Sequence, residues 1–114
     1  MPDDAIDLST FNELQASAGA EFVTELVGTF FEEAPQMLAE LRSAQAAGAT
    51  ERFRRAAHSL KSNANTFGAL PLGVLARGLE LGGLDAIRAD ATPLDALDTE
   101  YARAAAALQE LTHG

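Results

Sequence analysis

The sequence predicts an all-α fold, an up-down antiparallel four-helix bundle with a short extra helix at its N-terminal end. Apolar residues recur every three or four positions through most of the 114-residue chain, which is the period of a helix with one buried face. No stretch shows the strict alternation of a strand, and no Asn-Gly or Asp-Gly hairpin turn is present. Because the segments between the helical patterns are short, neighbouring helices are expected to run antiparallel.

Length and composition indicate one domain, expected over residues 8–112 after a flexible acidic lead of residues 1–7. The chain has no cysteine, so disulfides and thiolate metal sites are excluded. Its formal net charge of −9 argues against binding to nucleic acid. No apolar run is long enough to span a bilayer and no signal-peptide pattern opens the chain, so a soluble cytoplasmic protein without membrane contact is expected.

The first two helices are delimited by a capping pattern and by glycines. Thr10 and Glu13 match a capping box, which predicts Thr10 as the N-cap of a short helix that ends before Gly19. A long helix is expected over residues 20–47, with Gly48 at its end and a kink or irregularity at Pro35. The apolar positions of these helices are Leu8, Phe11, Leu14, Phe22, Val23, Leu26, Val27, Phe30, Phe31, Ala34, Met37, Leu38 and Leu41.

Similar signals delimit the other three helices. Thr50 is the expected N-cap of a central helix that runs to about Thr66, and Gly68 is expected to adopt a left-handed conformation just beyond it. Pro71 suits the first turn of the next helix, which several glycines weaken or end early. The last helix is expected to start with Thr92 as N-cap and a proline directly after it. The apolar positions are Leu72, Leu75, Ala76, Leu79, Leu84, Ile87, Leu94, Leu97, Tyr101, Ala105, Leu108 and Leu111.

The central helix has two contrasting faces. At about 100° per residue, its apolar side chains fall on one side and His58 falls on the opposite side. The residues within roughly 60° of His58 on this projection are Arg54, Arg55, Lys61, Ser62 and Asn65. Half of the eight basic residues of this acidic chain lie within residues 52–61, so this island is expected to meet something anionic.

Several classes of chemistry are excluded by what the chain lacks. Its two histidines, His58 and His113, are far apart in the sequence and no Glu-x-x-His pair is present, so no metal site is expected. Without a glycine-rich loop or a Walker lysine, no cofactor or nucleotide site and no autonomous ATP-dependent kinase activity are expected. The helical neighbours of His58 are basic or neutral, which argues against a general-base histidine held by a carboxylate.

The remaining hypothesis is that His58 is a nucleophile. An exposed imidazole is largely neutral near pH 7, and one ring nitrogen can then attack an electrophilic phosphorus atom and carry the group covalently. Lys61 follows one turn later and Arg54 precedes by one turn, so both are placed to stabilise the charge of that group. Ser62 is small and leaves the ring uncovered. On helix geometry alone, an ordinary exposed histidine stays an open alternative.

The segment AAHSLKSNANTFGA, residues 56–69, resembles the signature of the histidine-containing phosphotransfer domain family, which reads roughly A-H-x-L-K-G with a second glycine ten residues after the histidine. His58 matches the phosphorylated histidine, Lys61 the lysine beside the phosphoryl group and Gly68 the second glycine. The segment LGVLARGLE, residues 72–80, is similar to the family's next helix, which often ends in Leu-Glu. Ser62 departs from the usual glycine but adds only a hydroxyl, so function is expected to survive.

This resemblance implies a phosphocarrier of a two-component phosphorelay. A free-standing monomer is expected, because the chain begins with Met and carries nothing after the bundle, and a domain cut from a hybrid kinase is the open alternative. The group would pass from an aspartyl phosphate on one receiver domain, through His58, to an aspartate on another. Response-regulator receiver domains are the implied partners and would supply an acidic pocket and Mg²⁺, with a hybrid histidine kinase as a further candidate partner. Two alternatives stay open, a phosphorylation-independent helical adaptor that uses the same face and the dimerisation and histidine domain of a sensor kinase. That domain usually has an acid directly after the histidine, where this chain has Ser59.

Overall fold

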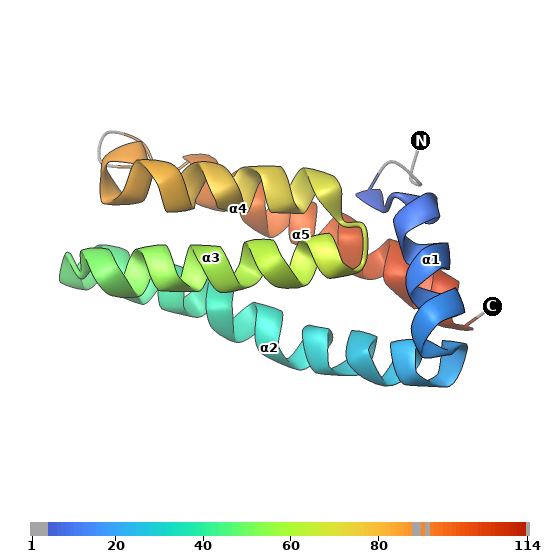
Figure 1. Ribbon diagram of the computed structural model, residues 1–114. Coiled ribbons are helices and arrows are strands. Elements are labelled where there is room, and N and C mark those ends of the chain that lie inside the picture. The colour runs from blue at the N-terminus through green and yellow to red at the C-terminus, as the bar shows by residue number, and fades with distance from the viewer. Residues whose placement is uncertain (1–4, 88–89, 91, 114) are drawn as a thin grey trace.

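The computed structural model describes residues 5–87, 90 and 92–113, and over these residues the chain is helical with no strand. Figure 1 shows the long helices running up and down beside one another, while the short first helix lies across one end of them. The all-α bundle with one extra N-terminal helix is therefore confirmed. The elements are α1 (Leu8–Ala18), α2 (Ala20–Ala47), α3 (Thr50–Thr66), α4 (Leu70–Gly82), the 3-10 helix η2 (Gly83–Ile87) and α5 (Thr92–His113).

The apolar faces of the helices meet in one core. Phe30 of α2 lies at its centre, with its ring centroid 5.4 Å from that of Phe67 and 5.7 Å from that of Tyr101 on α5. The apolar side of the central helix is buried as the helical period predicts, at Phe53, Ala56, Ala57, Leu60, Ala64 and Phe67. Burial of this side fixes the rotation of α3 about its axis and turns the opposite, polar side to solvent.

Two helix starts differ from the expected ones by a few residues. The N-cap of α1 is Asp7, whose Oδ2 accepts hydrogen bonds from the backbone N–H and the hydroxyl of Thr10, so Thr10 as N-cap is wrong. A carboxylate suits this position because the helix N-terminus carries a partial positive charge. Thr50 is already helical and the N-cap of α3 is Ala49, which makes no side-chain capping bond.

The last helix also begins earlier than expected. Thr92 is already helical, and Asp90 Oδ1 accepts its backbone N–H at 2.9 Å. Thr92 as N-cap is therefore wrong, because the aspartate two residues earlier supplies the capping acceptor. Within α2, the helix continues on both sides of Pro35.

The expected flexible lead also needs correction for the part of it that the structure describes. Residues 1–4 lie outside the described residues, but Ala5 and Ile6 are buried. The backbone N–H of Asp7 donates to Gly68 O at 2.7 Å. An added Cβ on Gly68 would lie 2.7 Å from Asp7 O, and its φ of +82° suits glycine. The turn between α3 and α4 is thus closed by the N-terminal segment, which the helical period alone did not reveal.

Some apolar positions expected in the core are exposed. Leu8 is 45% exposed and Phe22 is 51% exposed. Both lie in the first turn of their helices, at an end of the bundle where fewer helices surround a side chain. Of the helices built from described residues, none combines the length and the apolar character that crossing a bilayer needs.

Candidate functional site

The candidate site lies along the contact between α3 and α4, which run side by side in Figure 1. His58 stands on the solvent side of α3, and 57% of its side chain is exposed. The opposite face of the same turn is anchored by the buried Ala57 and Leu60. The exposure of His58 therefore follows from the amphipathic pattern of its helix.

A carboxylate from α4 joins the two residues that the sequence singled out. Glu80 Oε2 lies 2.7 Å from His58 Nδ1, and Glu80 Oε1 accepts a hydrogen bond from Lys61 Nζ at 2.8 Å. The interpretation that no carboxylate holds His58 is therefore wrong. That interpretation considered only the neighbours of His58 along its own helix, whereas Glu80 reaches the ring from the next helix. The Leu-Glu end of residues 72–80 was the one sequence signal that pointed to it.

The electrostatics of this triad fix the proton on the ring. The hydrogen bonds from Lys61 and then from His58 hold the pKa of Glu80 below its usual value, so this carboxyl group is ionised near neutral pH. Because a carboxylate only accepts hydrogen bonds, Nδ1 is the donor. A neutral imidazole with its proton on Nδ1 has its lone pair on Nε2. The arrangement thus presents Nε2 as a nucleophile and leaves Lys61 with two further N–H donors.

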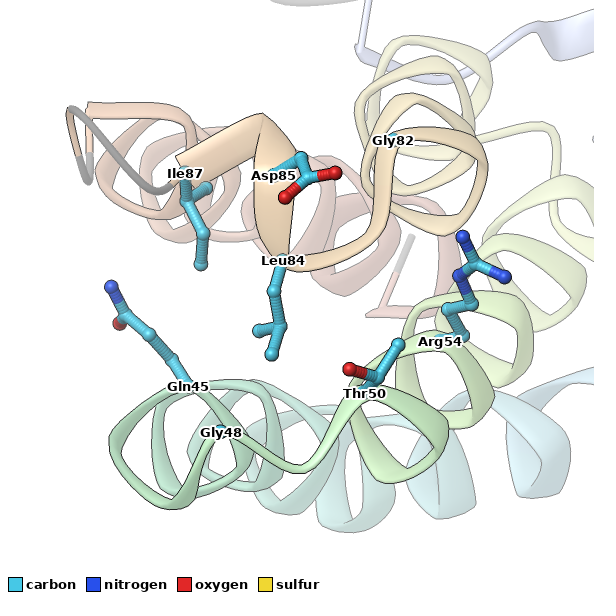
Figure 2. Close-up of a pocket in the computed structure, with 8 residues that line it drawn as sticks. All are labelled: Gln45, Gly48, Thr50, Arg54, Gly82, Leu84, Asp85 and Ile87. Carbon is cyan, nitrogen blue, oxygen red and sulfur yellow. The ribbon is translucent and has the colours of Figure 1, made fainter.

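The two neighbouring arginines diverge to opposite sides of His58. Arg54 extends toward the turn between α4 and η2, as Figure 2 shows, and an added Cβ on Gly83 would lie 3.0 Å from its Nε. Arg55 instead lines a groove on the side of α2, together with Met37 and Ser59. Neither side chain makes an ion pair within the described residues. Both cations are therefore open to an incoming group, each from its own side.

The other sequence-predicted residues lie further along the same helix. Ser62 is exposed one turn after His58 and Asn65 is exposed one turn later. Asn65 packs onto Gly73 of α4, because an added Cβ there would collide with Asn65 Oδ1. Gly73 is thus a second residue that sequence reasoning missed, since a glycine inside a helix carries no signal of what approaches it. With Gly73 opposite Asn65 and Glu80 opposite Lys61, the two helices are held in one register.

A separate cavity of about 620 Å³ lies at the end of the bundle, between the α2–α3 turn and η2 (Figure 2). Arg54 lines this cavity and is also one of the polar neighbours of His58 on α3. Among the described residues, no group of three or more histidine, aspartate or glutamate side chains is arranged to hold a metal ion. His58, with more than half of its side chain exposed, lies outside this cavity.

Comparisons with known proteins agree with this geometry. A family model named Hpt domain matches residues 25–111, which is most of the chain and includes the whole of α3 and α4. No curated protein and no solved structure gave a significant match. Since the match covers the exposed histidine, the lysine one turn later and the carboxylate that joins them, the chain belongs to the Hpt domain family, whose members are helical bundles that act in histidine phosphotransfer in phosphorelays.

Proposed function

We propose that this chain carries a phosphoryl group on Nε2 of His58 and passes it between aspartates of receiver domains. The observation that carries the proposal is the exposed imidazole whose Nδ1 is held by Glu80 at 2.7 Å while Lys61 is held by the same carboxylate at 2.8 Å. This arrangement orients the ring, leaves one nitrogen free and places a cation one turn away.

The transfer step follows from these positions. The lone pair of Nε2 forms the bond to phosphorus, the bond between phosphorus and the aspartyl oxygen breaks, and the aspartate leaves as a carboxylate. The ring becomes cationic and keeps its Nδ1 proton, and the ionised Glu80 stabilises that charge. The free N–H donors of Lys61 neutralise charge on the phosphoryl oxygens. The reverse sequence, with an aspartate as the attacking group, delivers the phosphoryl group to a second receiver.

Most of the remaining machinery belongs to the partner in this proposal. Phosphoryl transfer needs positioning and charge stabilisation more than covalent chemistry, and the receiver supplies an acidic pocket and Mg²⁺. A hybrid histidine kinase that contains a receiver domain is a suitable donor. In this proposal the chain acts in the cytoplasm. It acts as a monomer, because the α3–α4 face must stay open to one receiver after another. Light scattering tests the oligomeric state.

The test is transfer from phosphorylated receiver domains of the source organism to the purified chain and to its His58→Gln variant. The wild type is expected to gain phosphate that is labile to acid and stable to alkali, and the variant is expected to gain none. Since His58 is exposed and lies opposite the core, the variant should keep its circular dichroism spectrum and its melting temperature. A receiver that binds the chain without any transfer would contradict the proposal and support the phosphorylation-independent adaptor.

A further inference from the structure

Large apolar side chains gather on the outward face of α4. Among the described residues, five large hydrophobic side chains are exposed, and three of them, Leu70, Val74 and Leu81, belong to this one helix. Their spacing of four and seven residues places them on one side of the helix, opposite the buried Leu72 and Leu79. Val74 is 69% exposed and Leu81 is 66% exposed, so neither is covered by the rest of the chain. Large apolar side chains exposed together on one side of a helix are typical of an interaction site.

The apolar surface extends beyond α4 to the N-terminal segment. A groove of about 620 Å³ runs between Ile6 and Leu8 on one side and Leu70, Pro71 and Val74 on the other. Leu8 is the fourth of the five exposed large hydrophobics. Three of the five, Leu8, Leu70 and Val74, thus line this groove, which is less scattered than single exposed side chains on an ordinary surface.

Arg77 joins this surface to the phosphotransfer site. It lies one turn from Val74, Leu81 and Glu80, and on the helix it stands between Gly73 and Glu80, both of which contact polar side chains of α3. We name Leu70, Val74, Arg77 and Leu81 the α4 face. This face therefore begins within one helical turn of the carboxylate that holds His58.

The arginines of the described chain divide into two groups. Arg42, Arg52 and Arg103 are ion-paired to acidic side chains of the same chain. By contrast, Arg54, Arg55 and Arg77 make no ion pair within the described residues, and all three lie within about one turn of His58 or Glu80 along their helices. In a chain with a net charge of −9, three unpaired arginines around one site indicate an acidic partner there.

We propose that the α4 face is the surface that selects the receiver domain which exchanges phosphate with His58, and that this receiver offers it an apolar surface bearing a carboxylate. The inference rests on the proposed function and adds a chemical requirement for the partner. Apolar side chains around an arginine are the composition of an interface core rather than of ordinary surface. A second copy of this chain fits less well, because a two-fold contact on this face brings Arg77 of both copies together.

The test uses the receiver domain that transfers best to the wild type and measures its affinity and its transfer rate with the double variant Val74→Ser/Leu81→Ser. The dissociation constant is expected to rise roughly tenfold or more, because apolar anchors of an interface are lost. The transfer rate at saturating receiver is expected to stay within about twofold, because the residues at the reacting group are unchanged. Arg77→Glu is expected to weaken the same complex, and to do so less at high salt.

The matched control is Ala102→Ser, which places a serine on the exposed face of α5, and it should bind as the wild type does. All variants replace exposed residues, so melting temperatures should confirm that they are folded. A wild-type dissociation constant for Val74→Ser/Leu81→Ser would overturn the inference while leaving the proposed function intact. A wild-type dimer that these two substitutions dissociate would overturn it as well, since a second copy would then be the occupant. Absence of transfer from every receiver to the wild type would instead refute the proposed function.

Discussion

Helix α3 is joined to α2 on one side and to α4 on the other. On each side a carboxylate of the neighbouring helix accepts two hydrogen bonds from α3, but the donor residues differ. On the α2 side, Glu40 accepts two N–H groups of Arg52, at 2.9 and 2.8 Å, and the guanidinium also donates to Ser43. On the α4 side, Glu80 also accepts two N–H groups, but one comes from His58 and the other from Lys61. In both cases the carboxylate comes from the adjacent helix and its pKa is lowered by these hydrogen bonds.

The two sides differ in the lone pairs and N–H donors that the donor residues keep after these hydrogen bonds are made. Arg52 is always charged and has no lone pair to offer, so its pair with Glu40 can only hold the helices together. His58 keeps a free ring nitrogen with a lone pair, and Lys61 keeps two N–H donors. In the proposed mechanism, the carboxylate of Glu40 is therefore structural because it saturates a cation, whereas the carboxylate of Glu80 orients a group that can still react.

Of the changes around α3, a bulky side chain at position 62 is expected to lower the transfer rate most. Ser62 is exposed one turn after His58, so a leucine at this position occupies the path of an incoming aspartyl phosphate. Ser62→Leu should lower the transfer rate by on the order of 100-fold or more, since a misplacement of about 1 Å has that effect. Ser62→Gly is the control and should transfer normally with a slightly less stable helix. Wild-type transfer by the leucine variant, with unchanged circular dichroism, would show that the receiver approaches from another side.

Removal of the cation on the α4 side is expected to have the next largest effect. Lys61→Ala should slow transfer by about tenfold to 100-fold, because one charge-stabilising donor is lost from the reacting group. His58 should still become phosphorylated after long incubation, since the nucleophile is unchanged. Single-turnover rates with a phosphorylated receiver measure the effect. Rates equal to those of the wild type would remove Lys61 from the mechanism and direct attention to Arg54.

Glu80→Gln tests the carboxylate itself. The variant keeps the shape of the side chain but lacks the charge that stabilises the cationic ring, so transfer should slow by about tenfold.

The Glu80→Gln variant should also lose a pH dependence of stability. Because the pKa of Glu80 is lowered from 4.5 by folding, its charge stabilises the fold above pH 4.5, and this contribution disappears as the pH falls through the lowered value.

Thermal denaturation at a series of pH values checks this contribution. The wild type should be the more stable protein at pH 7, and the difference should shrink in acid. A difference that grows on acidification would contradict the account.

The smallest effect is expected on the α2 side. Arg52→Ala breaks the pair with Glu40, but both side chains are more than 40% exposed, and exposed pairs contribute little to stability. The melting temperature should fall by less than about 3 °C and the transfer rate should be unchanged. A transfer defect as large as that of Lys61→Ala would erase the distinction between the two sides of α3.

The parts of this picture that follow from local pattern were predictable. The helical period alone places Phe53, Leu60 and Phe67 in the core, and the same period places His58 and Lys61 on the opposite side of the helix. Helix ends at Gly48 and Gly68 followed from the need for a left-handed backbone, and both have positive φ.

What depended on the register between helices was not predictable from the sequence. Glu80 is 22 residues from His58, and only the packing of α3 on α4 brings them together. The close approach of Asn65 to Gly73 depends on the same register. The predicted N-caps Thr10 and Thr50 were wrong. Several residues near a helix start can serve as the N-cap, and backbone geometry, not residue type alone, decides which of them does.

The most direct test of the central claim is the position of the phosphoryl group on the ring. The protein, labelled with ¹⁵N-histidine, would be phosphorylated by its receiver and the ring nitrogens of His58 observed by NMR. Phosphorus is expected on Nε2, with a proton retained on Nδ1 and hydrogen-bonded to Glu80. Phosphorus on Nδ1 of His58, or on a residue other than His58, would contradict it.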